Sequence, residues 1–397
     1  MTEAHAALAD ATQQLNPCFA MVAGETSGDL LAGLLLDGLR ERWPAMSAVG
    51  IGGPRMRERG FRAWWPHDKL SVHGFGWEVL RRFREILGIR NQLKARLLQQ
   101  RPAVFIGVDA PDFNLDLEAA LRKQGVKTVH FVAPSFWAWR ANRLEKIRAS
   151  VDHVLCIFPF EPALLAQHGI AATYVGHPLA NVIPMAPDRL AARLQLGLLP
   201  NDQVVALLPG SRGSEVRNLA TRFFQAAQLL QRERPAVKFI VPAIPALKAE
   251  IERAAASCSE LRHLQIVEGQ SHTLLAACDV CLVASGTATL EAALFKRPMV
   301  IAYHMSWLSW QLVRHRMLQP WVGLPNILCR DFVVPELLQD AATPQALCRS
   351  VLNWLDAQQQ APEKIAALQA KFSALHAELQ RDTPRLAAHA IAQVLQA

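Results

Sequence analysis

The chain of 397 residues is long enough for two or three domains of roughly 150 residues each. With 51% hydrophobic and 19% charged residues it can build large cores, which excludes a disordered protein. Its net charge of +8 favours a polyanionic partner, and nucleic acid, nucleotide phosphate and an anionic membrane surface all remain open.

Cysteine usage and hydropathy indicate a reducing compartment and no membrane-spanning helix. The seven cysteines are scattered and odd in number, which does not fit a disulfide framework. Residues 1–17 contain no Lys or Arg and so lack the basic region of a signal peptide. The uncharged run Pro162–Pro187 holds four prolines, and Pro298–Val313 is shorter than the ~20 apolar residues of a membrane helix. We expect a cytosolic protein that is soluble or peripheral to a membrane.

Short apolar runs alternate with helical patterns such as Leu30–Arg42 and Ala220–Arg234. This alternation predicts βαβ units and parallel sheets. The expected strands are Cys18–Ala23, Ala48–Ile51, Val104–Val108, Thr128–Val132, His153–Ile157, Thr173–Val175, Val204–Leu208, Lys238–Val241, Leu264–Val267, Val280–Val283 and Met299–Ala302.

A Pro- and Gly-rich stretch, Gly176–Asp188, separates the two sets of strands and is typical of a linker. We therefore predict an α/β protein with two doubly wound domains, residues 18–183 and 184–343, after an extension of residues 1–17. Residues 344–397 are expected to form a helical tail. Its segments each open with a proline suited to a helix N-terminus: Pro344–Gln358, Pro362–Leu379 and Pro384–Leu395.

Ligands of doubly wound sheets bind beyond the carboxyl ends of the strands, so the strand-to-helix loops are the candidate sites. In the first loop, Gly24–Asp29, hydroxyl and acidic side chains can bind a sugar or a phosphate, with Glu25 and Ser27 as candidates. A simple capping turn would explain Thr26 or Ser27 but not the acids. The next loop, Gly50–Pro54, lacks the third glycine of a dinucleotide fingerprint and is a weak nicotinamide site.

An acidic loop follows the wholly apolar strand Val104–Val108. A carboxylate at the end of a buried strand is costly to desolvate unless it is used or paired. Asp109 is therefore the candidate general base, and Asp112 or Asn114 is expected to cap the helix that follows. After the next strand, the aromatic loop Pro134–Arg140 either holds a sugar or an acyl chain, or seals the sheet edge.

Two loops of the second half have the composition of phosphate sites. The loop Pro209–Glu215 contains Gly210, Ser211 and Arg212, and the planar, always charged guanidinium of arginine fits phosphate oxygens. The loop 284–291 leads from a strand into a helix, where backbone N–H groups and the helix dipole favour a diphosphate. Its candidate residues are Ser285, Gly286, Thr287 and Ala288, with Glu291 placed to accept from a ribose hydroxyl.

No metal-binding pattern is present in the sequence. The single CxxC, Cys278–Cys281, falls on an expected strand, where residues three apart face opposite sides. No HExxH or comparable cluster of histidine and acid occurs. We expect neither a metal nor a cofactor.

The segment from Trp77 to Arg96 carries six basic residues against two acidic ones, interleaved with apolar positions. A basic amphipathic helix with aromatic residues is a candidate for lying on an anionic membrane. The alternative is a surface helix packed on its own domain, and no motif supports nucleic acid. The proposed membrane contacts are Trp77, Leu80, Arg81, Arg82, Phe83 and Arg84.

Seven segments occur in the same order in lipid-A-disaccharide synthases, and the chain resembles that family from about Phe19 to Phe332. The segments are GETSGD, GGPRM, GxDAPDFN, PSxWAWR, LLPGSRxxEV, ASGTATLE and LPN, the last being Leu324–Asn326. The resemblance implies a glycosyltransferase of the GT-B type. It implies an acceptor-side Rossmann-like domain (18–183), a UDP-sugar-binding one (184–343), and a site in the cleft between them.

The resemblance also implies the substrates. The donor would be UDP-2,3-diacylglucosamine and the acceptor 2,3-diacylglucosamine 1-phosphate (lipid X). The products would be UDP and the β-1′,6-linked lipid A disaccharide 1-phosphate, an intermediate of lipopolysaccharide biosynthesis. All of these molecules are anionic, so the positive net charge of the protein would favour their binding. The enzyme would work at the inner face of the inner membrane. A homodimer is compatible with these expectations, and a nucleic-acid partner is not expected.

The implied mechanism is a direct displacement with inversion and without a metal. Asp109 would remove the proton of the acceptor 6-hydroxyl, with Glu25 and Ser27 facing the acceptor. Arg212 and the helix start at Ser285–Ala288 would stabilise the leaving UDP. The remaining donor contacts would be Glu291 to the ribose and Asn326 to the donor sugar or phosphate.

Other functions remain as alternatives. Another UDP-sugar enzyme of the same fold, such as a peptidoglycan N-acetylglucosaminyltransferase or a UDP-N-acetylglucosamine epimerase, is the nearest. An epimerase needs no acyl-binding surface, so the helix within 76–101 argues against it. A lipid- or nucleotide-binding regulator has no use for Asp109 at a strand end, and UDP release would separate it from an enzyme.

Overall fold

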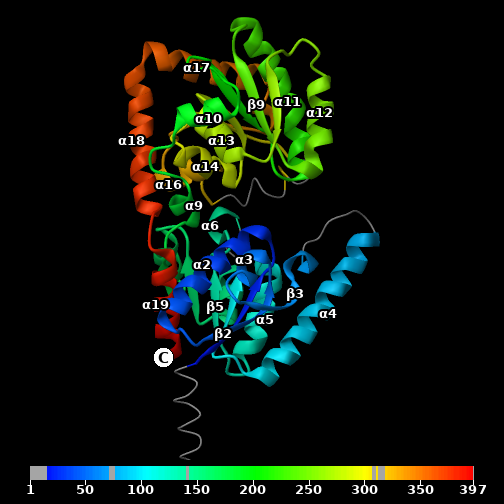
Figure 1. The fold of residues 1–397 in the computed structure, drawn as a ribbon, viewed down its shortest axis with the longest axis vertical. Coiled ribbons are helices and arrows are strands. Elements are labelled where there is room, and N and C mark those ends of the chain that lie inside the picture. The colour runs from blue at the N-terminus through cyan, green and yellow to red at the C-terminus, as the bar shows by residue number, and fades with distance from the viewer. Residues whose placement is uncertain (1–15, 71–76, 140–142, 306–309, 312–317, 397) are drawn as a thin grey trace, which may run out of the picture. The chain divides into compact units, whose positions relative to one another are not determined.

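The computed structural model describes residues 16–70, 77–139, 143–305, 310–311 and 318–396. The chain divides into two compact units (Figure 1). Unit 1 is Met1–Pro178 together with Leu379–Ala397, and unit 2 is Leu179–Glu378. The predicted domain boundary after residue 183 thus lies a few residues beyond the observed division.

Unit 1 is built on a parallel sheet that has seven strands in the described part of the chain, in the order β3-β2-β1-β4-β5-β6-β7. Its strands are β1 (Cys18–Ala23), β2 (Ser47–Gly52), β3 (Arg62–Pro66), β4 (Val104–Val108), β5 (Lys127–Phe131), β6 (His153–Cys156) and β7 (Ala172–Tyr174). The helices are α2 (Thr26–Arg42), α3 (Pro54–Arg57), α4 (Trp77–Gln100), α5 (Pro111–Arg122), α6 (Phe136–Trp139), α7 (Arg143–Ser150) and α8 (Glu161–Ala166). The strand order reverses between β1 and β4, which defines the crevice of this sheet.

Burial explains why the central strands of unit 1 could be predicted from the sequence. Every residue of β4 is buried, because helices cover both faces of a parallel sheet, and the strand is therefore a continuous apolar run. On one face Phe105 packs against Leu93 and Leu97 of α4 and against Leu117 and Leu121 of α5. Each such buried side chain contributes about 1.5–3 kcal/mol relative to exposure.

The carboxyl-terminal helix α19 (Thr383–Gln396) belongs to unit 1, where it packs on α2 (Figure 1). The approach is close: a side chain at Gly38 of α2 would collide with the carbonyl of Pro384. The buried residues of α19 include the small Ala387 and Ala388 and the larger Ile391. The predicted helical tail is therefore divided between the two units.

Unit 2 repeats the architecture with a parallel sheet, six-stranded over the described residues, in the order β10-β9-β8-β11-β12-β13. Its strands are β8 (Val204–Leu208), β9 (Lys238–Ala243), β10 (Leu264–Glu268), β11 (Val280–Ala284), β12 (Met299–Tyr303) and β13 (Glu336–Leu338). The helices include α9 (Pro178–Val182), α10 (Arg189–Gln195), α11 (Gly213–Glu233), α12 (Lys248–Ala256), α13 (Ser271–Ala277), α14 (Thr287–Leu294), α16 (Leu324–Cys329), α17 (Pro344–Gln360) and α18 (Pro362–Leu379). Here the strand order reverses between β8 and β11.

The predicted fold class is confirmed. Each expected strand is present, with ends within two residues of the prediction. Two edge strands, β3 and β13, were not predicted from the sequence. β3 has the half-buried sequence RAWWP and β13 is only three residues long, so neither shows the buried apolar run that marks the central strands. No helix in the described part of the chain is both long and apolar enough to cross a bilayer.

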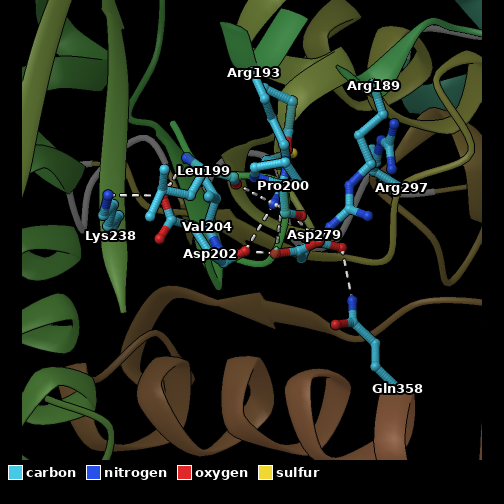
Figure 2. A network of polar contacts seen from close by, with 12 residues as sticks. Arg189, Arg193, Leu199, Pro200, Asp202, Val204, Lys238, Asp279, Arg297 and Gln358 are labelled. Carbon is cyan, nitrogen blue, oxygen red and sulfur yellow. Dashed lines mark hydrogen bonds and ion pairs between the residues drawn. The ribbon is translucent and has the colours of Figure 1, made fainter. Parts of the chain in front are cut away.

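A buried ionic network holds the amino ends of β8 and β11 together (Figure 2). Arg193 of α10 is 1% exposed and donates through Nη2 to both carboxylate oxygens of Asp279, at 3.1 and 3.0 Å. Asp279 also accepts the backbone N–H of Val204 at 2.8 Å, and Arg189 pairs with it from the more exposed side. These residues lie at the end of the sheet opposite to the strand-to-helix loops, where they hold the two strand ends together.

Candidate functional site

In unit 1 the loops after β1 and β4 meet at the reversal of strand order. The contact is tight, since a Cβ placed on Gly24 would lie 2.9 Å from the Cβ of Ala110. The predicted acceptor loop Gly24–Asp29 and the acidic loop after β4 therefore form one surface. This is the position at which open α/β sheets bind ligands.

Asp109 directly follows β4 and is half-buried at this edge. Its backbone N–H continues the sheet by donating to the carbonyl of Phe131 at 2.9 Å. Asp109 and Ala110 both have left-handed backbones, with φ of 52° and 43°. Two consecutive non-glycine residues in this region cost of order 1–3 kcal/mol each, a strain that typically occurs at functional sites.

Asp112 differs from Asp109 in its surroundings. Its side chain is 89% exposed and contacts Arg143 at 3.1 Å. The prediction that Asp112 or Asn114 caps α5 is wrong: the N-cap residue is Ala110, and no side chain caps it. Asn114 is instead fully buried, and its side-chain amide donates to the carbonyl of Asp109.

The two acidic residues of the loop after β1, Glu25 and Asp29, differ in burial. Asp29 is buried and its carboxylate accepts the backbone N–H groups of Gly53, Arg55 and Met56 at 2.7, 2.9 and 3.2 Å. It thereby fixes the amino end of α3, a structural use that the sequence analysis did not find. Glu25 and Ser27 are exposed. Their side chains are accessible to a ligand, as the acceptor role predicted for them requires.

In the described part of the aromatic loop after β5, the side chains of Pro134, Phe136 and Trp137 are buried and Ser135 is exposed. Trp137 is buried against Phe158 and Phe160, and its indole N–H donates to Glu161 at 2.9 Å. Burial raises the pKa of Glu161 to about 7. For Trp137 the sealing of the sheet edge, one of the two predicted alternatives, is the observed arrangement.

Unit 2 has a cavity of about 310 Å³ at the carboxyl ends of its strands, lined by the loops that follow β8 and β11. The structure brings together here eight of the nine predicted donor-site residues. They are Gly210, Ser211, Arg212, Ser285, Gly286, Thr287, Ala288 and Glu291. A loop-lined cavity next to a helix N-terminus is a place where a diphosphate can bind.

The loop after β8 is shaped by Glu215, in the first turn of α11. This carboxylate accepts the backbone N–H groups of Ser211 and Arg212 at 2.9 and 3.2 Å and contacts the Arg212 guanidinium at 3.2 Å. Gly210 has a φ of 130°, and a side chain there would collide with Glu215. The start of α11 is thus already capped, whereas the Arg212 side chain is 77% exposed beside the cavity and can contact an anion.

The loop after β11 supplies the other wall. Gly286 has a φ of 152° and is the N-cap residue of α14, with no side chain capping the helix. The N-terminal N–H groups of α14 therefore lie at the cavity with the positive end of the helix dipole. These groups favour a phosphate at this wall.

Glu291 lies one turn further along α14 and lines the same cavity. Burial raises the pKa of Glu291, and His272, whose Nε2 lies 3.7 Å from the carboxylate, opposes that rise. A carboxylate in this position can accept hydrogen bonds from a ribose. No cluster of three or more His, Cys, Asp or Glu side chains suited to a metal occurs among the described residues.

Asn326 is the predicted donor residue that the structure does not bring to the cavity. It is fully buried, and its amide donates to Val334 and Glu336 at 2.9 and 2.8 Å while its oxygen accepts from the Val334 N–H at 3.0 Å. The Glu336 carboxylate in turn accepts the backbone N–H of Gly323 at 2.9 Å. The residue before Gly323 is Val322, whose carbonyl accepts the hydroxyl of Ser285 at 3.3 Å. Asn326 thus supports the loop behind the cavity instead of facing a ligand.

The predicted membrane helix exists as α4, which runs along the outside of unit 1 (Figure 1). Its carboxyl-terminal half packs into the core through Ile89, Leu93 and Leu97, and Arg96 stacks on Trp64 at 4.0 Å. Arg84 is exposed. The side chains of the other proposed contacts, at positions 77, 80, 81, 82 and 83, lie outside the described residues.

Two doubly wound units, the second with a phosphate-type cavity at its switch point, define a protein of the GT-B class. The sequence model of the lipid-A-disaccharide synthetase family matches residues 19–391. The chain belongs to this family.

Curated relatives of high identity support the same assignment. The chain is 77% identical to the lipid-A-disaccharide synthase of Albidiferax ferrireducens over 377 residues, covering 95% of this chain and 97% of the relative. It is 65% identical to that of Verminephrobacter eiseniae, over 95% and 97% of the two chains.

Solved structures show the same fold at low identity. A putative UDP-N-acetylglucosamine 2-epimerase from Listeria monocytogenes superposes with a TM-score of 0.60 at 12% identity, covering 96% of this chain and 95% of the other. The Anabaena protein Alr3699/HepE, solved with UDP and glucose, gives a TM-score of 0.57 at 16% identity over 96% and 100%.

Proposed function

We propose that this protein is a lipid-A-disaccharide synthase that joins two acylated sugars with inversion. The donor is UDP-2,3-diacylglucosamine and the acceptor is 2,3-diacylglucosamine 1-phosphate (lipid X). The observation that carries the proposal is the family match over residues 19–391, with Asp109 at the switch point of unit 1 and the phosphate-type cavity at that of unit 2.

Separate residues act on the acceptor and on the donor. Asp109 takes the proton of the acceptor 6-hydroxyl as that oxygen attacks the anomeric carbon of the donor, and the carbon–oxygen bond to UDP breaks on the opposite face. Glu25 and Ser27, exposed on the adjoining loop, bind the acceptor sugar. Arg212 and the amino end of α14 stabilise the charge that develops on UDP, and Glu291 holds the ribose.

The direct test is a reaction with both substrates, followed by mass spectrometry for the disaccharide 1-phosphate and by an assay for UDP. UDP-N-acetylglucosamine, which carries no acyl chains, serves as the control donor. A lipid- or nucleotide-binding regulator would bind these molecules without releasing UDP.

Because Arg212 and a helix terminus are assigned the charge stabilisation, turnover should persist in EDTA. A loss of turnover that Mg²⁺ or Mn²⁺ restores would contradict that part of the mechanism.

Arg212→Ala should lower turnover by about 10²–10³-fold, the usual effect of removing one donor that stabilises a developing negative charge. Arg217→Ala is the matched control, since Arg217 lies in α11, the helix that Arg212 precedes, and pairs with Glu250 at 3.8 Å. Steady-state kinetics on both variants checks this. Equal effects of the two substitutions would remove Arg212 from the mechanism.

We also propose that the amino-terminal half of α4 contacts the inner face of the inner membrane. The carboxyl-terminal half is anchored in the core, and in the sequence Trp77, Phe83 and a cluster of arginines belong to the amino-terminal half. Changing Arg81, Arg82 and Arg84 to Glu should weaken binding to phosphatidylethanolamine–phosphatidylglycerol vesicles by about a hundredfold at low salt, since each basic residue contributes about 1 kcal/mol.

Two further variants complete the vesicle test. Changing Leu80 and Phe83 to Ser should remove the binding that persists at high salt, because that part comes from apolar insertion. The matched control changes the exposed residues Arg232, Arg253 and Arg262 of unit 2 to Glu, which alters the net charge equally. If this control loses as much vesicle binding as the α4 variant, the contact is a general effect of charge and not a property of α4.

A further inference from the structure

The turn that carries Asp109 needs an external restraint. Asp109 and Ala110 are left-handed, and Ala110 caps α5 without any side-chain hydrogen bond. For alanine the left-handed region costs roughly 1–2 kcal/mol, and no glycine relieves it here. Without a partner that holds the Asp109 carbonyl, the turn would relax toward ordinary backbone angles and the carboxylate would move with it.

Asn114 supplies that restraint. Its Nδ2 donates to the carbonyl of Asp109 at 2.8 Å, and the carbonyls of Val22 and Val108 lie 3.4 and 3.5 Å away. The carbonyl of Ala110 accepts the backbone N–H of Asn114 at 3.0 Å. One buried amide thus joins the ends of β1 and β4 to the strained turn. Within the described residues its Oδ1 has no hydrogen-bond partner, so the side chain is used for donation.

A second buried pair holds Asn114 in place. Glu118, one turn further along α5, contacts His130 Nδ1 of β5 at 2.8 Å, and both residues are fully buried. Gly107 of β4 pairs with His130, and a Cβ on Gly107 would lie 2.8 Å from the Cβ of Asn114. Helix α5 therefore lies directly on β4 and β5, and the position of Asn114 cannot shift along the sheet.

We infer that Asn114 is a positioning residue of the transfer reaction, which sets the direction of the Asp109 carboxylate by holding its left-handed backbone. This inference rests on the proposed function, in which Asp109 is the base. Asn114 is fully buried and cannot touch a substrate, so it acts only through Asp109. A helix of this length needs no such amide in its first turn, because an ordinary Ser or Asp at the N-cap would start it.

The test is a double-mutant cycle with Asp109→Asn and Asn114→Ala. Asn114→Ala alone should lower kcat about 10- to 100-fold, the effect of a misplaced catalytic group, with the KM for the donor and the affinity for UDP unchanged. In the Asp109→Asn background the same substitution should have almost no further effect on kcat, because the group that it positions is gone. Near-normal kcat in Asn114→Ala, or an equal loss in both backgrounds, overturns the inference.

A rescue variant separates positioning from stability. Ala110→Gly lowers the strain of the turn without touching the Asn114 amide. Added to Asn114→Ala, it should restore the thermal unfolding temperature while kcat stays low, because Asp109 itself remains left-handed and its carbonyl still lacks the Asn114 amide. Recovery of both quantities would make Asn114 a structural residue only. Failure of the proposed function is visible separately: Asp109→Asn would then retain normal turnover whatever Asn114 does.

Discussion

Asp109→Asn should lower turnover by about 10²–10⁴-fold and leave the affinity for UDP unchanged. The amide has the shape of the carboxylate but cannot take the proton of the acceptor hydroxyl. Asparagine also adopts left-handed backbone angles readily, so it should preserve the φ of 52° at this position. Steady-state kinetics with both substrates, together with calorimetric titration of UDP, measures the two effects independently.

The matched control for Asp109→Asn is Asp112→Asn, three residues further on in the first turn of α5. The Asp112 side chain is 89% exposed and its carboxylate contacts the guanidinium of Arg143, an arrangement worth less than about 1 kcal/mol. Its removal should leave turnover close to normal. A large loss in Asp112→Asn with a near-normal Asp109→Asn would reverse the two assignments.

The fold was predictable because its signal is local. In a parallel sheet covered on both faces each central strand is a short apolar run, and β4 and β8 match the predicted ranges at both ends. The placement of α19 was not predictable. Its amphipathic pattern predicts that the helix has a buried face. The sequence does not say what covers that face, and the close contact between Gly38 and Pro384 in the structure shows that it packs on α2.

The candidate site was predictable to the extent that it lies in strand-to-helix loops. Topology alone brings the loops after β8 and β11 together, and the residue types of Arg212 and Glu291 then indicate their chemistry. The uses of Asn114 and Asn326 were not predictable. The sequence does not show which partner a polar side chain will meet, and the partners here include Val22, 92 positions away, for Asn114. A buried amide and an exposed one look alike in the sequence.

Arg193→Met should lower the free energy of unfolding of unit 2 by about 3–5 kcal/mol, the usual cost of removing one partner of a buried ion pair. Among the described residues, Asp279 would keep Arg189 as its ion-pair partner, on the more exposed side (Figure 2). Four carbonyl oxygens that Arg193 now satisfies would also lose their donor: those of Ala277, Leu199, Pro200 and Asp202. Urea denaturation followed by tryptophan fluorescence measures the loss.

The double variant Arg193→Met/Asp279→Asn should be less destabilised than the sum of the single variants, because it leaves no unpaired charge inside the protein. Since the network lies at the amino ends of β8 and β11, the folded fraction of each variant should bind UDP with normal affinity. A loss of stability below about 1 kcal/mol in Arg193→Met would show that water reaches Asp279 and replaces the guanidinium. Weakened UDP binding at full folding would show instead that the two ends of this sheet are coupled, and that the amino-end network helps to shape the cavity.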